Sequence, residues 1–127
     1  MTDEDRIQLA TSFIVALRAG DVNGFRAIMT DDVVWTLPGT SLVSGIAKGV
    51  EGVLKRARTI VDYGANVEIQ HVAVGYEGVA LLLHNTGNRN GRILDEYLTT
   101  VCTLRNAKIV RLETYISDVA MVNAYFA

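Results

Sequence analysis

The sequence predicts an α+β fold in which three N-terminal helices cover one face of a curved antiparallel sheet. Up to about Asp62, apolar residues recur mainly at helical spacing. From Asn66 onward, four extended segments are separated by short polar or glycine-containing connections. Short connections between long strands are typical of an antiparallel meander, and helices that precede such a sheet indicate the α+β class.

The first two helices have recognisable ends. Thr2 and Asp5 have the spacing of a capping box, and Gly20 is placed to end the helix that they begin. Asp21 is placed to cap a short second helix.

A strand and a third helix are expected next. Val33–Leu37 has strand character and ends at Pro38. Thr40–Gly49 is expected to be a loop, followed by a helix to about Asp62 with Gly64 as its stop. The four strands that follow are expected over Asn66–Val74, Val79–Thr86, Arg92–Leu104 and Lys108–Ser117, with a short helix or turn over Val119–Phe126.

Composition indicates one domain over residues 1–127. Hydrophobic residues make up 50% of the chain and charged residues 20%, which is typical of a globular protein. A net charge of -2 gives no basic field for nucleic acid, and no apolar run is long enough to cross a membrane. Cys102 is the only cysteine, so no internal disulfide is possible. A reducing, cytoplasmic location is the expectation.

Two carboxylates fall on strand faces that are otherwise apolar. Glu96 shares its face with Leu98, Cys102 and Leu104. Asp118 shares its face with Val110, Leu112 and Ile116. A buried carboxylate without partners is costly, so such positions usually have a chemical or structural reason.

Each carboxylate has a functional and a structural interpretation. Asp118 is a candidate general acid or base, but Asp is also a favoured cap for the segment Val119–Phe126. Glu96 is a candidate to bind a substrate oxygen or to share a proton with Asp118. A register shift of one residue would instead expose Glu96 to solvent.

His71 and Trp35 are further candidates. Alternation places His71 on the apolar, or dry, face of its strand. It is either a base beside a carboxylate or a histidine of the core or rim whose hydrogen bonds are made within the protein. Trp35 has the parity of Val33 and Leu37, so it either forms a wall of a pocket for a flat apolar ligand or fills the core.

The sequence lacks the motifs that are typical of several kinds of functional site. No His, Asp or Glu cluster has metal-ligand spacing, and neither a phosphate-binding loop nor a serine nucleophile elbow is present. No metal, cofactor, nucleic acid or membrane partner is therefore expected.

Three segments resemble the nuclear-transport-factor-2-like superfamily, and within it the branch of SnoaL-like polyketide cyclases and ketosteroid isomerases. The segments are Ala19-Gly20-Asp21 with Thr30–Trp35 and Leu37-Pro38-Gly39, then Gly45–Gly49, then Lys108-Ile109-Val110 with Tyr115–Asp118. The resemblance implies a cone closed by helices, with an apolar pocket in the concave face of the sheet. It also implies cofactor-free acid–base chemistry or ligand binding in that pocket.

Aligning the catalytic residues of these enzymes with this sequence, one position at a time, indicates which of their mechanisms the chain could use. The steroid isomerases carry a Tyr, a carboxylate and a protonated Asp where this chain has Phe13, Leu37 and Thr100. The epoxide hydrolases carry an Arg and an Asp at about Leu81 and Leu83. Neither mechanism is therefore expected here, whereas the strand-end Asp of the cyclases matches Asp118.

The resemblance also indicates the pocket lining. By this resemblance, the side chains of Leu83 and Asn85 are expected to point into the pocket. Trp35, Phe13 and Leu37 are expected as further walls, and Thr100 as a ligand contact. The expected function is cyclisation, isomerisation, dehydration or hydrolysis of a small, apolar, oxygenated substrate by Asp118 with Glu96 or His71. The alternatives are a ligand-binding protein without chemistry and a dimeric interaction module.

The opposite face of the last two strands carries a mixture of aromatic, polar and charged residues. This face is either solvated or a homodimer interface, which the family commonly forms there. Its residues are Tyr97, Thr99, Val101, Arg111, Glu113 and Tyr115.

Overall fold

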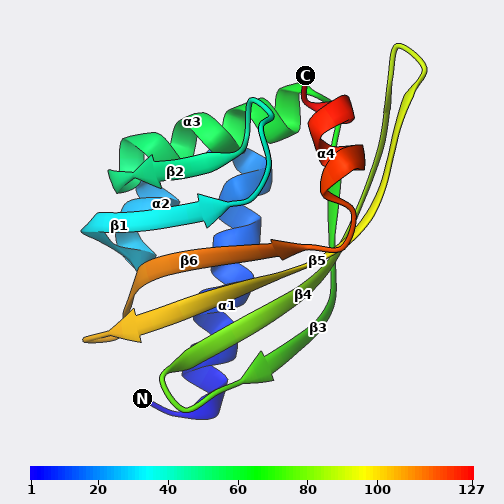
Figure 1. Cartoon of the computed structure of the whole chain (residues 1–127). Coiled ribbons are helices and arrows are strands. Elements are labelled where there is room, and N and C mark those ends of the chain that lie inside the picture. The colour runs from blue at the N-terminus through cyan, green and yellow to red at the C-terminus, as the bar shows by residue number, and fades with distance from the viewer.

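The computed structural model describes residues 1–127 as four helices and six strands (Figure 1). The helices are α1 (Asp3–Ala19), α2 (Val22–Ile28), α3 (Gly49–Asp62) and α4 (Val119–Tyr125). The strands are β1 (Met29–Leu37), β2 (Gly45–Lys48), β3 (Asn66–Val74), β4 (Gly78–Arg89), β5 (Arg92–Arg105) and β6 (Lys108–Ile116). No helix is long and apolar enough to span a membrane.

The six strands form one curved sheet in the order β2-β1-β6-β5-β4-β3. Strands β3 to β6 form the predicted antiparallel meander. The sheet as a whole is mixed rather than wholly antiparallel, because β1 pairs in parallel with β6. In Figure 1, α1 crosses one face of the sheet, and α4 lies between the loop after β1 and the long β4–β5 hairpin.

The predicted helix ends are confirmed. The Thr2 side chain accepts from the backbone of Asp5, whose carboxylate accepts in return from the backbone of Thr2. Gly20 ends α1 with φ 59°, a left-handed conformation that suits glycine, and Asp21 caps α2.

Part of the expected loop over Thr40–Gly49 is a strand. β2 pairs with β1 through four residues, and it forms an edge of the sheet with only Ala47 buried. So short an edge strand has too little buried alternation to be recognised in the sequence.

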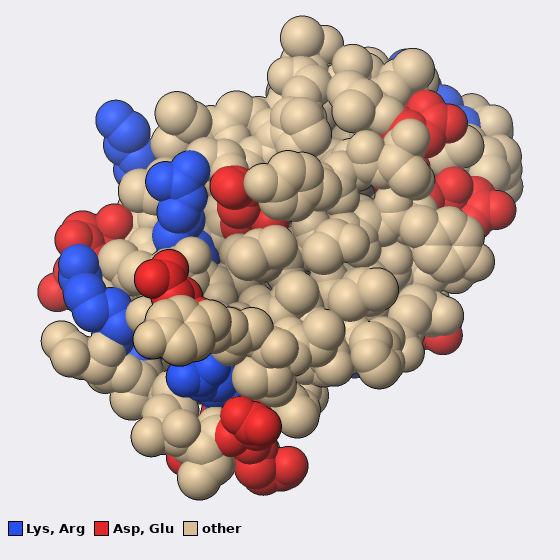
Figure 2. All heavy atoms as spheres, turned by 60° about the horizontal axis from the view of Figure 1, so that its bottom comes forward, with Lys and Arg blue, Asp and Glu red and all other residues tan.

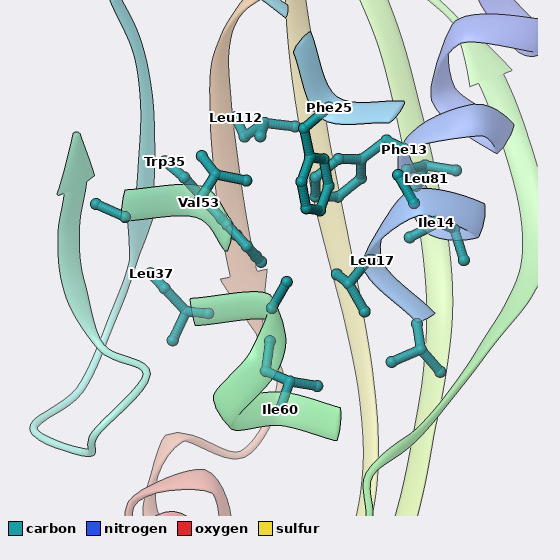
Figure 3. Packing of buried hydrophobic residues seen from close by; sticks show 14 of the residues in the cluster. Phe13, Ile14, Leu17, Phe25, Trp35, Leu37, Val53, Ile60, Leu81 and Leu112 are labelled. Atoms are coloured by element: carbon teal, nitrogen blue, oxygen red, sulfur yellow. The ribbon is translucent and has the colours of Figure 1, made fainter. Parts of the chain in front are cut away.

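The core lies between the sheet and the helices (Figure 3). Phe13 of α1 contacts Phe25 of α2 at a ring-centroid distance of 5.9 Å. It also meets Trp35 of β1 edge-on at 5.5 Å. These rings join the helical layer to the sheet, and truncating one of them would cost about 3–5 kcal/mol.

Two irregularities interrupt the strand alternation. The β3–β4 register shifts between Ile69 and His71, so that His71 is exposed. The prediction that His71 lies on the dry face is therefore wrong, because a bulge reverses the parity of the residues beyond it. A second shift, in the β5–β6 pairing, buries Ile109 and leaves Val110 and Leu104 half-buried.

Three hydrogen bonds hold helix α4 and the residue after it against the loop after β1 and the end of α3. The Asn123 side chain accepts from the Thr40 backbone at 2.8 Å, and the Phe126 carbonyl accepts from the Leu42 backbone at 3.0 Å. The Tyr125 hydroxyl donates to the carbonyl of Tyr63. The helix thereby closes one end of the space between the sheet and the other helices.

Candidate functional site

The concave face of the sheet and the helices enclose a cavity of about 40 Å³. That volume holds only a few water-sized molecules, since one water needs about 10–15 Å³ by this measure. Of the 18 lining residues, 14 are hydrophobic. The polar ones are Asn85, Glu96, Thr100 and Thr114.

The structure brings most of the predicted site residues to this one cavity. Every residue expected to contact a ligand lines it, and Glu96 lines it as well. The ligand-contact predictions concern Trp35, Phe13, Leu37, Leu83, Asn85 and Thr100. Their contact with a ligand remains a prediction. Asp118 and His71 do not line the cavity, and both are exposed.

Glu96 is the central polar residue of the cavity. It is only 1% exposed, and its Oε1 accepts three hydrogen bonds. The donors are the backbone N–H of Ser117 at 2.8 Å, the hydroxyl of Ser117 at 3.2 Å and the backbone N–H of Asp118 at 3.2 Å. These donors fix the orientation of the carboxylate and offset part of the cost of burying it.

The second oxygen of Glu96 is unpartnered. Oε2 is buried, and no group of the chain donates to it. Glu96 also takes part in none of the ion pairs of the chain. Since Oε1 faces the segment after β6, Oε2 is the oxygen available to a molecule in the cavity.

Asn85 lies beside Glu96. The two residues are direct partners in the antiparallel pairing of β4 with β5, so their side chains are neighbours on the concave face. The Asn85 Oδ1 atom is also buried without a hydrogen-bond partner. The cavity therefore has two adjacent polar groups whose hydrogen bonding the chain does not complete.

Thr100 and Thr114 form a second polar group, whose oxygen atoms are hydrogen-bonded to each other and to Trp35. Their hydroxyl oxygens lie 2.9 Å apart, and the Thr114 oxygen accepts from Trp35 Nε1 at 2.9 Å. Thr100 is four residues from Glu96 along β5, or about 13 Å. This network fixes the Trp35 ring and lies too far along the strand to act on the same ligand atom as Glu96.

A buried cation supports Trp35 from outside the cavity lining. Arg56 of α3 is 7% exposed and donates to the carbonyls of Trp35 at 2.8 Å and Gly45 at 3.1 Å. Its guanidinium carbon lies 4.9 Å from the centre of the Trp35 ring. Burial lowers the pKa of Arg56 from 12.5 to about 10. Arg56 thus ties α3 to β1 and β2 and holds the indole in place.

The placement predicted for Asp118 on the pocket face is wrong. Strand β6 ends at Ile116, before the alternation reaches Asp118. The Asp118 side chain instead caps α4 by accepting from the Met121 backbone at 3.0 Å. This is the structural alternative that its sequence context allowed, and the geometry does not favour a role for Asp118 in proton transfer.

The other histidine lies outside the cavity. His84 Nε2 is 2.6 Å from Asp95 Oδ1, and its ring stacks on Tyr97 with centroids 4.3 Å apart. Cys102 is buried, and desolvation raises the pKa of its thiol to about 12. No three His, Cys, Asp or Glu side chains are close enough together to hold a metal ion.

Sequence reasoning missed three residues of the site: Arg56, Thr114 and Ser117. Thr114 could have been found, because it has the parity of Leu112 and Ile116. Ser117 acts largely through its backbone N–H, which carries no sequence signal. A buried arginine on a helix resembles a solvated one in sequence.

Comparisons with known proteins identify the fold. The sequence profile of the SnoaL-like domain family matches residues 10–112. The chain is 24% identical over 131 residues, covering 100% of both chains, to the uncharacterized protein Rv0034 of Mycobacterium tuberculosis. Its fold is similar to that of an NTF2-like protein from Burkholderia xenovorans, with a TM-score of 0.81, 20% identity and coverage of 98% of both chains. It is also similar to TerC co-crystallized with polyporic acid, with a TM-score of 0.80, 17% identity and coverage of 97% of this chain and 99% of that one.

Proposed function

This chain belongs to the SnoaL-like domain family, and we propose that it is a cofactor-free acid–base enzyme acting on a small, apolar, oxygenated substrate. The observation that carries the proposal is Glu96: a carboxylate 1% exposed, fixed through Oε1, with Oε2 unpartnered beside an apolar cavity. A positioned carboxylate of this kind is suited to accept and return a proton.

In the proposed reaction, Glu96 Oε2 takes a proton from the substrate while the electron pair stays on the substrate. Because Oε1 already accepts three hydrogen bonds, the proton resides on Oε2, inside the cavity. Glu96 then returns the proton to another substrate atom, which gives a tautomer. In a cyclisation, the electron pair first forms a bond to a carbonyl carbon of the same substrate, and the proton goes to the oxygen of that carbonyl. Asp118 takes no part in this proton transfer.

The walls of the cavity limit the substrate. The lining is mostly hydrophobic, and Trp35 and Phe13 present flat aromatic surfaces held at a fixed angle. A cavity of about 40 Å³ is smaller than a ring-sized ligand needs, so side chains must shift to admit one. Val122 and Phe126, at the α4 end of the lining, are the residues whose displacement would enlarge it.

Exchange of carbon-bound hydrogen tests this proposal. The protein is incubated in D2O with a panel of small enolisable ketones and phenols that carry apolar substituents, and deuterium uptake is followed by NMR. We expect exchange above the buffer rate for at least one compound, and a loss of about 100-fold or more in the Glu96→Gln variant.

The matched control is Glu68→Gln, which makes the same change on β3 at an exposed residue that does not line the cavity. It should exchange at the wild-type rate. Binding of a panel compound in the cavity without any exchange would contradict the enzyme and favour the alternative, a ligand-binding protein with the same pocket.

We also propose that the chain pairs with a second copy through the outer face of β4, β5 and β6. Leu82, Tyr97, Val101 and Tyr115 are all exposed on neighbouring strands there. The face seen in Figure 2 supports this, because uncharged side chains cover its broad centre and charged ones gather mainly towards its margins. Light scattering should give twice the chain mass for the wild type and the single-chain mass for Tyr97→Lys; a wild-type monomer would contradict the proposal.

A further inference from the structure

We infer that the substrate of the proposed function presents a hydroxyl group, as a phenol, an enol or an alcohol does, whose hydrogen is donated to Glu96 beside Asn85. This inference rests on the same cavity as the proposed function and names the chemical class of its ligand. It follows from which hydrogen-bonding groups the chain leaves incomplete at that end of the cavity.

The two incomplete atoms are both acceptor oxygens, and the Asn85 amide carries an NH₂ group beside its oxygen. Glu96 Oε2 and Asn85 Oδ1 are buried, and neither receives a hydrogen bond from the chain. They lie on directly paired positions of β5 and β4 and face the same cavity. A buried acceptor without a donor costs about 1–3 kcal/mol, so a ligand that supplies a donor here gains affinity over one that does not.

Apart from the NH₂ group of Asn85, no part of the lining near Glu96 can supply a donor. The N–H of Trp35 is already bonded to Thr114, whose hydroxyl is bonded to Thr100, and this group is about 13 Å away along the strand. The lining contains no Lys, Arg or His. A ligand carbonyl at Glu96 would place an acceptor against the acceptor Oε2, which is repulsive.

The lining favours a neutral donor over a charged one. An ammonium group would also donate, but it would have to leave water for a cavity in which 14 of 18 lining residues are hydrophobic. Burying a second charge is expensive even when it is paired. A hydroxyl donates its one hydrogen to Glu96 Oε2 at a much lower desolvation cost, and its oxygen can accept from the Asn85 NH₂ group.

The donors around Oε1 make the inference testable by one substitution. In Glu96→Gln, the amide oxygen must face the three donors from Ser117 and Asp118, because the amide nitrogen cannot accept from them. The NH₂ group then replaces Oε2 at the cavity. The substitution therefore converts an acceptor at this point into a donor without changing its shape.

The experiment compares three probes of similar size: phenol, toluene and benzaldehyde. Their dissociation constants are measured by NMR titration, with the shifts of Leu83 and Leu98 methyl groups reporting the cavity. For the wild type we expect phenol to bind about tenfold or more tightly than toluene or benzaldehyde, the range for a hydrogen bond to a charged group. In Glu96→Gln the order should reverse, with benzaldehyde tighter than phenol, whereas Glu68→Gln should keep the wild-type order.

The outcomes separate this inference from the proposed function. Equal affinity of the wild type for phenol and toluene, or no binding of phenol, overturns the inference, and neither result depends on the folding of a variant. Retention of the phenol preference in Glu96→Gln also overturns it. A phenol preference that reverses as expected, together with no hydrogen exchange, supports the ligand class and refutes the enzyme.

Discussion

Replacing Gly87 by Ala should push helix α4 away from its position at the end of the cavity. An added Cβ at Gly87 would lie 2.4 Å from the Tyr125 hydroxyl oxygen and 3.0 Å from both the Tyr125 ring carbon Cζ and the Gly64 carbonyl oxygen. The hydroxyl would have to retreat by about 1 Å to reach ordinary contact, and it would then lose its hydrogen bond to Tyr63.

The expected destabilisation is about 1–3 kcal/mol, the usual cost of overpacking. Part of it is offset because Ala restricts the unfolded chain more than Gly does, by about 0.4–1 kcal/mol. Urea unfolding measures the change as a shift of the midpoint at constant slope. Gly75→Ala is the matched control, since its nearest neighbour would lie at 3.8 Å and no effect beyond about 0.5 kcal/mol is expected.

A double-mutant cycle with Tyr125→Phe identifies the cause. Tyr125→Phe removes the atom in closest contact and should cost about 1 kcal/mol for its hydrogen bond. Because that atom makes the closest contact, Gly87→Ala should cost less in the Phe background, a coupling of about 1–2 kcal/mol, although the contacts at 3.0 Å remain. Additive effects of the two changes would refute the placement of α4 against β4.

Three further experiments test other parts of the structure. Thr114→Val should cost about 1–3 kcal/mol in urea unfolding, because it leaves the buried N–H of Trp35 without its acceptor, while Thr114→Ser should cost much less; equal costs would contradict the network. Asp118→Asn should keep the cap of α4 and any exchange activity, whereas abolished exchange with an intact fold would restore Asp118 as the acid or base. Burial raises the pKa of the Cys102 thiol to about 12, so it should be unreactive towards a thiol reagent at pH 8 until urea unfolds the chain; rapid labelling of the folded protein would contradict its burial.

Local signals in the sequence predicted the helices well, because each end is specified by neighbouring residues. Thr2 with Asp5, Gly20 and Asp21 all act where the capping rules place them. The inward direction of Glu96 was also predictable, since β5 alternates without interruption from there to Cys102.

Other features depend on geometry that alternation cannot show. The β3–β4 register shift leaves one extra β3 residue between the paired positions Ile69 and His71, and this bulge turns the His71 side chain outward. Strand β6 ends at Ile116, so Asp118 lies beyond the strand and caps a helix. The parallel pairing of β1 with β6 joins segments far apart in the chain. The donors that fix Glu96 are mainly backbone groups at residues 117 and 118, so no pattern of side chains could have revealed them.

The central claim is that Glu96 meets the ligand, and the most direct test is to observe its carboxyl carbon. In protein labelled with ¹³C at the glutamate carboxyl groups, the Glu96 resonance is assigned by its absence in Glu96→Gln, and phenol is then titrated in. We predict that the Glu96 signal moves to saturation with the same dissociation constant as the Leu83 methyl groups, while that of Glu113 stays in place. A bound state in which the Leu83 methyl signals move and the Glu96 signal does not would contradict the account.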